Sequence, residues 1–470
     1  MNEQSLVACV APGALYRRAT MHPQSYPGPR ATPFIGPLRH LVRQDVLTHL
    51  CSLRAQYGDV VHLGAASGSP TFLIAGPDAT KHVLQDNNRN YRKGRAAQRM
   101  KSVFGSGSLL LEGDQWRIRR RLVQPAFHRE KISSVVDTFA EAAEGLAKRL
   151  RNEGEDFDVR EEMLALTMQL TVRNMFSSNI QGELGELIGA WHVLYESLTS
   201  SRFSPLQALR WLPTPTSRRQ RAARETVDRV LFRLIEAQRL ADTDDGSVLS
   251  MLVRAVDDDG VSGMSDAEIR DETMTIFVGG YETSSNALAF SLALLADNPS
   301  FAERHFEEVR GVLGANRPTI ADLASLPLNR MLLQESMRLY PPSWLITREA
   351  IAEDVLNGVQ IPAGAQLLLS SYVTHHDPSH WNAPDDFNPM RFSDAESASR
   401  PKFTYFPFGG GPRLCLGEQY AMTEIQIILA TLANHLSFTL APGVRIAAQA
   451  NVGLRPRYPL YLRARARDGV

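Results

Sequence analysis

The chain has 470 residues, of which 43% are hydrophobic and 22% charged, a balance that excludes a disordered or fibrous protein. Its 51 Lys and Arg residues equal its 51 Asp and Glu residues, so the formal net charge is zero, and nothing in that balance indicates nucleic acid or an anionic membrane as a partner. The length allows a sizeable core.

Residues 1–22 are predicted to form a tail ahead of one domain, residues 23–470. The start lacks a basic region, and its apolar run, Leu6 to Leu15, is interrupted by Pro12 and Gly13. It therefore predicts neither a signal peptide nor a membrane span. Three cysteines form no disulfide framework: Cys9, Cys51 and Cys415. We expect a soluble, cytoplasmic monomer with reduced thiols.

Strand signals lie in two regions of the chain. Val60–Leu63 and Thr71–Ile74 predict a strand pair joined by a turn at Gly64–Ser69, and a second region covers about 355–373, with a turn at Asn357-Gly358. We expect β-rich parts at about 23–75 and 351–375, and helical parts at about 114–350 and 415–436. The fold class is therefore mainly α with small β-sheets (α+β).

Three conspicuous runs are interpreted as surface or turn segments. Arg218–Arg221 is followed by acidic residues on the same predicted helix, which indicates a solvated helix start. Asp257–Gly260 lacks the spaced ligands of a calcium loop. His375, His376 and His380 lack the spacing of a zinc site, so no metal cluster is predicted there.

Trp116 and Arg120 are spaced i and i+4 on a predicted helix, where both can face one anion. The neighbouring Arg117, Arg119 and Arg121 fit a solvated basic face. That face would also suit docking of an acidic electron-transfer protein.

A Ser-x-x-Glu capping box at residues 265–268 predicts the start of a long helix, which Asn-Pro at 298–299 ends. Gly279 and Gly280 inside it each cost roughly 1 kcal/mol relative to alanine. Gly279 shares a face with Thr283, so a planar cofactor and a small gas could approach beside a hydroxyl that can bond the Gly279 carbonyl. Close helix packing explains the glycines equally well. Further along the chain, Glu335 and Arg338 are spaced i and i+3 among apolar residues, which favours a buried ion pair.

The strongest signal is Phe-Gly-Gly-Gly-Pro-Arg-Leu-Cys-Leu-Gly at residues 408–417. A Gly-rich loop lets backbone N–H groups approach the Cys415 sulfur, and a helix beginning near Cys415 adds a positive dipole end, so both favour a thiolate. Gly417 leaves room for a flat cofactor, Phe408 can cover the sulfur, and Arg413 can reach an anionic edge. A lone cysteine would favour a structural role, but the combined positions do not.

This segment resembles the haem-binding loop of the cytochrome P450 family, Phe-x-x-Gly-x-Arg-x-Cys-x-Gly, at every position. The resemblance implies the P450 fold, with haem b between the long helix and the cysteine loop and Cys415 as its axial ligand. Residues 279–284 resemble the family's Gly-Gly-x-Glu-Thr-Thr/Ser motif, which implies that Thr283 donates a hydrogen bond to dioxygen and Glu282 helps deliver protons. The residues implied to contact the haem are Phe408, Gly411, Gly417 and Gly279, with Trp116, Arg120, Arg348 and Arg413 at its propionates.

Glu335 and Arg338 resemble the family's Glu-x-x-Arg motif, and Arg391 would complete its structural triad. Met390 stands where the family has glutamate, which removes one local charge partner. The resemblance also implies pocket residues: the segment around 95–103, Phe277, Ser343, Trp344, Leu345 and the turn at Val452–Gly453. For each of these, core packing is an alternative.

The implied activity is a monooxygenase of secondary metabolism that inserts one oxygen atom from O2 into a lipophilic small molecule. Hydroxylation or epoxidation of a terpenoid, polyketide-derived or fatty-acid-like compound is expected. About 55 residues follow Cys415, so we expect electrons from a separate ferredoxin and ferredoxin reductase. Two alternatives remain: a peroxide-using or rearranging haem-thiolate enzyme, which commonly lacks the acid–threonine pair, and a haem-binding sensor, which needs no such pair.

Overall fold

The computed structural model describes residues 26–29, 45–66, 69–176, 183–200, 214–241, 243–256 and 263–467. Its α-helices are α2 (Val46–Tyr57), α3 (Pro77–Lys81), α4 (Arg95–Phe104), α5 (Gly113–Val123), α6 (Arg129–Glu153), α7 (Val159–Phe176), α8 (Leu184–Ser200), α9 (Pro215–Ala241), α10 (Val248–Arg254), α11 (Asp266–Asp297), α12 (Pro299–Leu313), α13 (Pro327–Leu339), α14 (Ser371–His375), α15 (Asp394–Ala398) and α16 (Glu418–His435). Its strands are β1 (Val60–Ala66), β2 (Ser69–Ile74), β3 (Tyr91–Lys93), β4 (Asp156–Asp158), β5 (Ile346–Ala350), β6 (Asp354–Leu356), β7 (Val359–Ile361), β8 (Gln366–Leu369), β9 (Leu436–Leu440), β10 (Ala448–Ala450), β11 (Leu454–Pro456) and β12 (Tyr461–Ala466).

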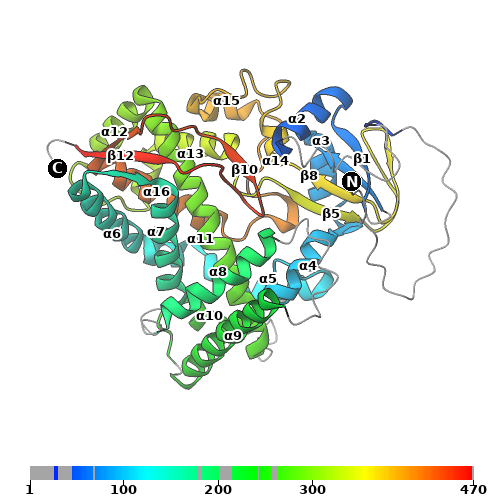
Figure 1. Cartoon of the computed structure of the whole chain (residues 1–470), viewed down its shortest axis with the longest axis horizontal. Coiled ribbons are helices and arrows are strands. Elements are labelled where there is room, and N and C mark those ends of the chain that lie inside the picture. Colours follow the sequence, from blue (N-terminus) through cyan, green and yellow to red (C-terminus); the bar gives the residue numbers. More distant parts are fainter. Residues whose placement is uncertain are drawn as a thin grey trace.

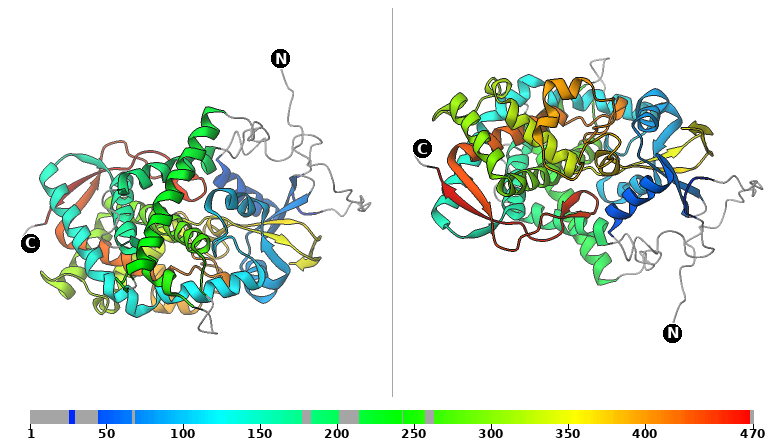
Figure 2. Two further views of the ribbon diagram at one scale, coloured as in Figure 1. Left: turned by 90° about the horizontal axis from the view of Figure 1, so that it is seen from below. Right: turned by 90° about the horizontal axis from the view of Figure 1, so that it is seen from above.

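Helices make up most of the molecule, and α11 runs through its middle (Figure 1). The views from below and above agree that the largest sheet lies at one end and that α6 and α12 lie at the other (Figure 2). That sheet has five strands in the order β1-β2-β8-β5-β3, and β4, β12 and β9 form a smaller one. The predicted α+β class is confirmed.

The strand predictions are confirmed in position and corrected in extent. β1 and β2 pair antiparallel as expected, but β1 continues to Ala66 and β2 begins at Ser69, so the turn predicted at Gly64–Ser69 was too wide. Between β6 and β7, Asn357 and Gly358 both have positive φ, 49° and 78°. This is the backbone that a tight hairpin turn requires, as the Asn-Gly pair predicted.

Three expectations about helices were wrong in detail. The part expected to be β-rich contains α2, because Asp45 caps it by accepting a hydrogen bond from Leu47 N and its leucines face the core. Residues 371–375 form α14 instead of a strand, since the Ser370 side chain accepts from Val373 N. The last helix begins at Glu418, three residues after Cys415.

The central helix α11 follows the prediction closely. Ser265 and Glu268 form the reciprocal capping box, and the helix ends at Asp297, just before Asn298. The largest core cluster joins the sheet to the helices, through Leu73 of β2, Phe139 of α6 and Leu288 of α11. A second cluster lies between α8, α9 and the first half of α11. The polar centre of α11 is therefore held between two packed regions.

Candidate active site

The loop before α16 is shaped by hydrogen bonds around Cys415. Cys415 N donates to Phe408 O at 3.0 Å, and Leu414 N donates to Gly411 O at 3.0 Å. Gly411 has φ +64°, and a Cβ there would lie 1.9 Å from the Leu84 carbonyl oxygen. Only glycine fits this close approach between the loop and the segment after α3.

Cys415 is accessible to solvent, yet enough protein surrounds it that burial raises the pKa of its thiol. The Gly417 N–H, which bonds the sulfur, and the Arg120 guanidinium act in the opposite direction, while Glu418 adds to the rise. The expected N–H contact is therefore present, but it does not outweigh burial. A metal cation at the sulfur would complete the stabilisation, since a coordinated thiol is deprotonated.

On α11 the two glycines serve different purposes. Gly279 is exposed in mid-helix, and a Cβ there would meet nothing within 4 Å. A Cβ on Gly280 would lie 3.3 Å from Thr171 Oγ1 of α7, so this glycine permits helix packing. The hydroxyl of Thr283 donates to Gly279 O at 2.5 Å, as its i−4 spacing predicted. The open space and the close packing were both weighed from the sequence, and each applies to one glycine.

Glu282 and Thr283 have different surroundings although they are adjacent. Thr283 is partly accessible, whereas Glu282 is 8% exposed and accepts a hydrogen bond from Tyr195 of α8. Burial raises the pKa of the Glu282 carboxyl, and Tyr195, Arg160 and Arg455 limit that rise. The pair thus combines a shielded acid with a hydroxyl on the open side of the helix.

Lysine and arginine side chains gather where β3, β5 and the cysteine loop meet. Lys93 lies opposite Arg348 in the β3–β5 ladder, an arrangement that is unfavourable for like charges. Arg413 donates to Leu111 O at 2.8 Å and to Glu112 at 2.6 Å, and Glu112 also accepts from Lys93 N at 2.7 Å. Burial and mutual repulsion lower the pKa of Lys93 to about 7, and those of Arg348 and Arg413 to about 10.

Trp116 lies between two of the predicted guanidinium groups. Arg413 is 3.8 Å and Arg120 5.8 Å from the centre of its ring. The expectation that Arg119 belongs to a solvated face was wrong, because it is buried and pairs with Glu268 and Glu272 of α11. Arg117 pairs with Asp114 at the surface.

The charges of this region fit a group with two carboxylates. Lys93, Arg348 and Arg413 carry three positive charges against the single carboxylate of Glu112, which leaves two unmatched. Haem b has two propionates, and the thiol of Cys415 and the open face at Gly279 fit its iron and its flat ring. No sequence motif marked Lys93 or Glu112; the only available signal was the pairing of Lys93 with Arg348, which needs the sheet register.

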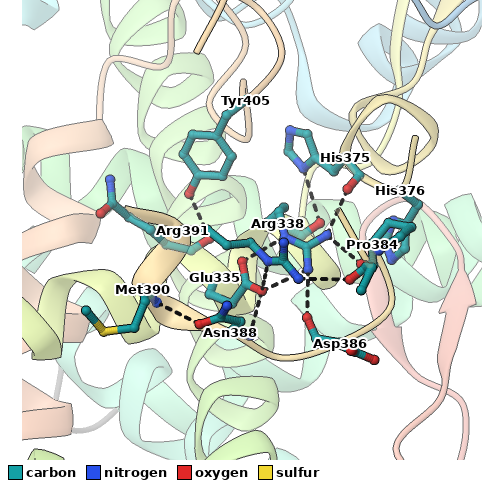
Figure 3. A network of polar contacts seen from close by, with 12 residues as sticks. Glu335, Arg338, His375, His376, Pro384, Asp386, Asn388, Met390, Arg391 and Tyr405 are labelled. Carbon is teal, nitrogen blue, oxygen red and sulfur yellow. Dashed lines mark hydrogen bonds and ion pairs between the residues drawn. The ribbon is translucent and has the colours of Figure 1, made fainter. Parts of the chain in front are cut away.

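The predicted structural triad is assembled away from these groups (Figure 3). Arg338 donates from Nε and Nη2 to the Glu335 carboxylate at 2.7 and 2.9 Å, and Arg391 Nε donates to it at 3.3 Å. Met390 lies beside them and leaves the triad intact. His375, once considered as a metal ligand, instead contacts Arg338 O at 3.2 Å and accepts from Phe406 N at 3.0 Å.

The proposed pocket residues are not brought together as one set. Phe277 and Val452 belong to the cluster under α8 and α9, where Phe277 contacts the Trp191 ring at 5.2 Å. Trp344 is buried in the other cluster and donates to Asn451 O at 3.0 Å, so it packs as core, with Leu345 beside that cluster. Ser343 is exposed. Several side chains of 95–103 lie outside the described set, as do Cys9 and 257–260.

Comparisons with known proteins agree on one family. The Cytochrome P450 family model matches residues 26–462. Cyclooctatin synthase of Streptomyces melanosporofaciens is 32% identical over 443 residues, covering 93% of this chain and 95% of the relative, and cyclooctat-9-en-7-ol 5-monooxygenase of that organism is 31% identical, covering 89% and 90%. The haem domain of cytochrome P450DA has the same fold, with a TM-score of 0.84 at 22% identity over 94% of this chain and 98% of that one.

The chain belongs to the cytochrome P450 family. It is a monooxygenase that uses haem, O2, an organic substrate and redox partners. Within the described ranges, no helix is both long and apolar enough to cross a membrane.

Proposed function

We propose that Cys415 is the axial ligand of a haem whose other face meets α11 at Gly279 and Thr283. One observation carries the proposal: a thiol that receives the Gly417 N–H, and an open, glycine-lined stretch in the otherwise buried centre of α11. Haem with a thiolate ligand supplies the activation of dioxygen. Lys93, Arg348 and Arg413, with Trp116 and Arg120, would bind its propionate edge.

In this proposal Thr283 and Glu282 move protons to the reacting oxygen. Thr283→Ala should keep the haem but divert electrons to peroxide, so product per electron falls by about 10²-fold or less, the usual range for a proton-transfer group. Ser285→Ala is the matched control, since Ser285 donates only to a helix carbonyl, that of Glu282, at 2.9 Å. An unchanged product yield in Thr283→Ala would remove this role.

The substrate is proposed to be a lipophilic cyclic compound of the terpenoid type. Two relatives at 32% and 31% identity are named for cyclooctatin and cyclooctat-9-en-7-ol, and the cluster under α8 and α9 is rich in aromatic and aliphatic side chains. Cyclooctat-9-en-7-ol is therefore the first probe. Titration should give a spin-state shift at micromolar concentration, tighter than that with lauric acid; a shift with small polar compounds alone would contradict the assignment.

Electrons are proposed to come from a ferredoxin that docks on α5. Arg117 and Arg121 are exposed there, on the helix that carries Trp116 and Arg120. Charge reversal at both positions should slow reduction by a ferredoxin, with a weaker dependence on salt. Charge reversal at Arg218 and Arg219 of α9 is the control. A reduction rate that stays the same at all salt concentrations would rule out this surface.

A further inference from the structure

The partner of Glu282 on α8 is a tyrosine to which no role has been given. Tyr195 is 9% exposed and donates a hydrogen bond to the Glu282 carboxyl, which is itself 8% exposed. A hydrogen bond to a buried carboxylate favours the charged form and fixes its orientation. Tyr195 therefore acts on both the protonation and the position of this acid.

The same face of α8 holds two consecutive residues of α11. Trp191, one helical turn before Tyr195, donates from Nε1 to the Tyr281 hydroxyl at 2.7 Å, and its ring stacks on Phe104 at 5.4 Å. Trp191 thus anchors α8 to α11 independently of Tyr195. Removal of the Tyr195 hydroxyl alone should leave the helices in place.

Each element packed around Glu282 adds a charged or titratable group. Arg160 of α7 and Arg455 of β11 favour the ionised carboxyl, as Tyr195 of α8 does, while burial opposes them. The Tyr281 hydroxyl, next to Glu282 in the chain, is engaged with Trp191. Tyr195 is the neutral donor in this set, so its removal changes hydrogen bonding without changing the total charge.

We propose that Tyr195 is a positioning residue for proton delivery, holding the Glu282 carboxyl toward α8 and favouring its charged form. This inference rests on the proposed function, because it matters only if Glu282 supplies protons on the Thr283 side of α11. With Tyr195 in place, Glu282 exchanges its proton at a lower pH than burial alone would set. The carboxyl must leave Tyr195 to deliver that proton.

The test is a pH titration of the Glu282 carboxyl in the haem-loaded protein, by the infrared C=O stretch that Glu282→Gln removes. In Tyr195→Phe the midpoint should move up by about one pH unit. Tyr281→Phe, which also removes a buried phenol hydroxyl, should leave it within about 0.2 units of the parent. Equal midpoints in Tyr195→Phe and the parent protein would overturn the proposal.

A second readout links the titration to turnover. If protonated Glu282 is the donor, product per electron falls as the pH rises past its pKa, and in Tyr195→Phe this alkaline limb should move upward with the infrared midpoint. A moved infrared midpoint with a fixed alkaline limb would show that Tyr195 sets the pKa without acting on proton delivery, which also overturns the proposal. Failure of the haem-thiolate function would appear separately, as a missing thiolate signature in the parent protein.

Discussion

Two groups of arginine side chains in this protein are treated in opposite ways. Around Glu335, the guanidinium of Arg338 is fully buried and its donors are used by the carboxylate and by the His375, Pro384 and Asp386 carbonyls. Between β3, β5 and the cysteine loop, Lys93, Arg348 and Arg413 repel one another, and the pKa of each is lowered.

The difference separates structure from binding. A buried charge network whose donors are all used needs nothing from outside the chain, whereas surplus charge of one sign predicts a ligand of the other sign. Glu424 of α16 shows a third solution: it is 1% exposed near Ser284 of α11, and burial raises its pKa to about 8. That carboxyl is neutral at physiological pH.

The largest effect is expected at the complete network. Glu335→Gln leaves Arg338 and Arg391 facing each other without a carboxylate, which should reduce the free energy of unfolding by about 3–5 kcal/mol. Urea denaturation of the haem-loaded protein measures it. A loss below about 1 kcal/mol would mean that the backbone carbonyls alone satisfy these arginines.

Glu424 should contribute a pH dependence of stability. The unfolded carboxyl ionises near 4.5 and the folded one near 8, so its contribution is present below 4.5 and is lost as the pH rises to 8. Glu424→Gln should remove a slope worth about 2 kcal/mol across this window. Parallel stability–pH curves for the variant and the parent would show that the carboxyl ionises in the folded protein.

At the surplus-charge region, Lys93→Met should act in opposite directions with and without haem. Haem release should become roughly tenfold faster, the value of one charge-assisted hydrogen bond. The haem-free protein should gain stability near pH 7, since less like charge remains. Lys81→Met, an exposed lysine paired with Asp86, is the control. Slower unfolding of haem-free protein without faster haem release would place the ligand elsewhere.

The smallest effect is expected at an exposed pair. Arg330 and Asp394 lie 3.5 Å apart, with Asp394 fully exposed, so Asp394→Asn should change the free energy of unfolding by less than about 0.5 kcal/mol. The same denaturation series provides the comparison. A loss like that of Glu335→Gln would mean that burial does not explain the difference between the two regions.

Features with a local signal could be predicted from the sequence. The capping box of α11, the Asn357-Gly358 turn, the Thr283–Gly279 bond and the Glu335–Arg338 pair each depend on residues a few positions apart. Lys93, Glu112 and Tyr195 could not be found this way, because their partners Arg348, Arg413 and Glu282 are far away in the chain. Arg119 was misassigned for the same reason: its carboxylates are on α11.

The central claim is that Cys415 ligates the haem iron as a thiolate. The most direct measurement is the difference spectrum of the reduced protein with carbon monoxide. The account predicts the long-wavelength Soret band of a thiolate ligand, its loss in Cys415→His and its retention in Cys51→Ser. A shorter-wavelength band in the folded parent protein, or a long-wavelength band that survives Cys415→His, would contradict the account.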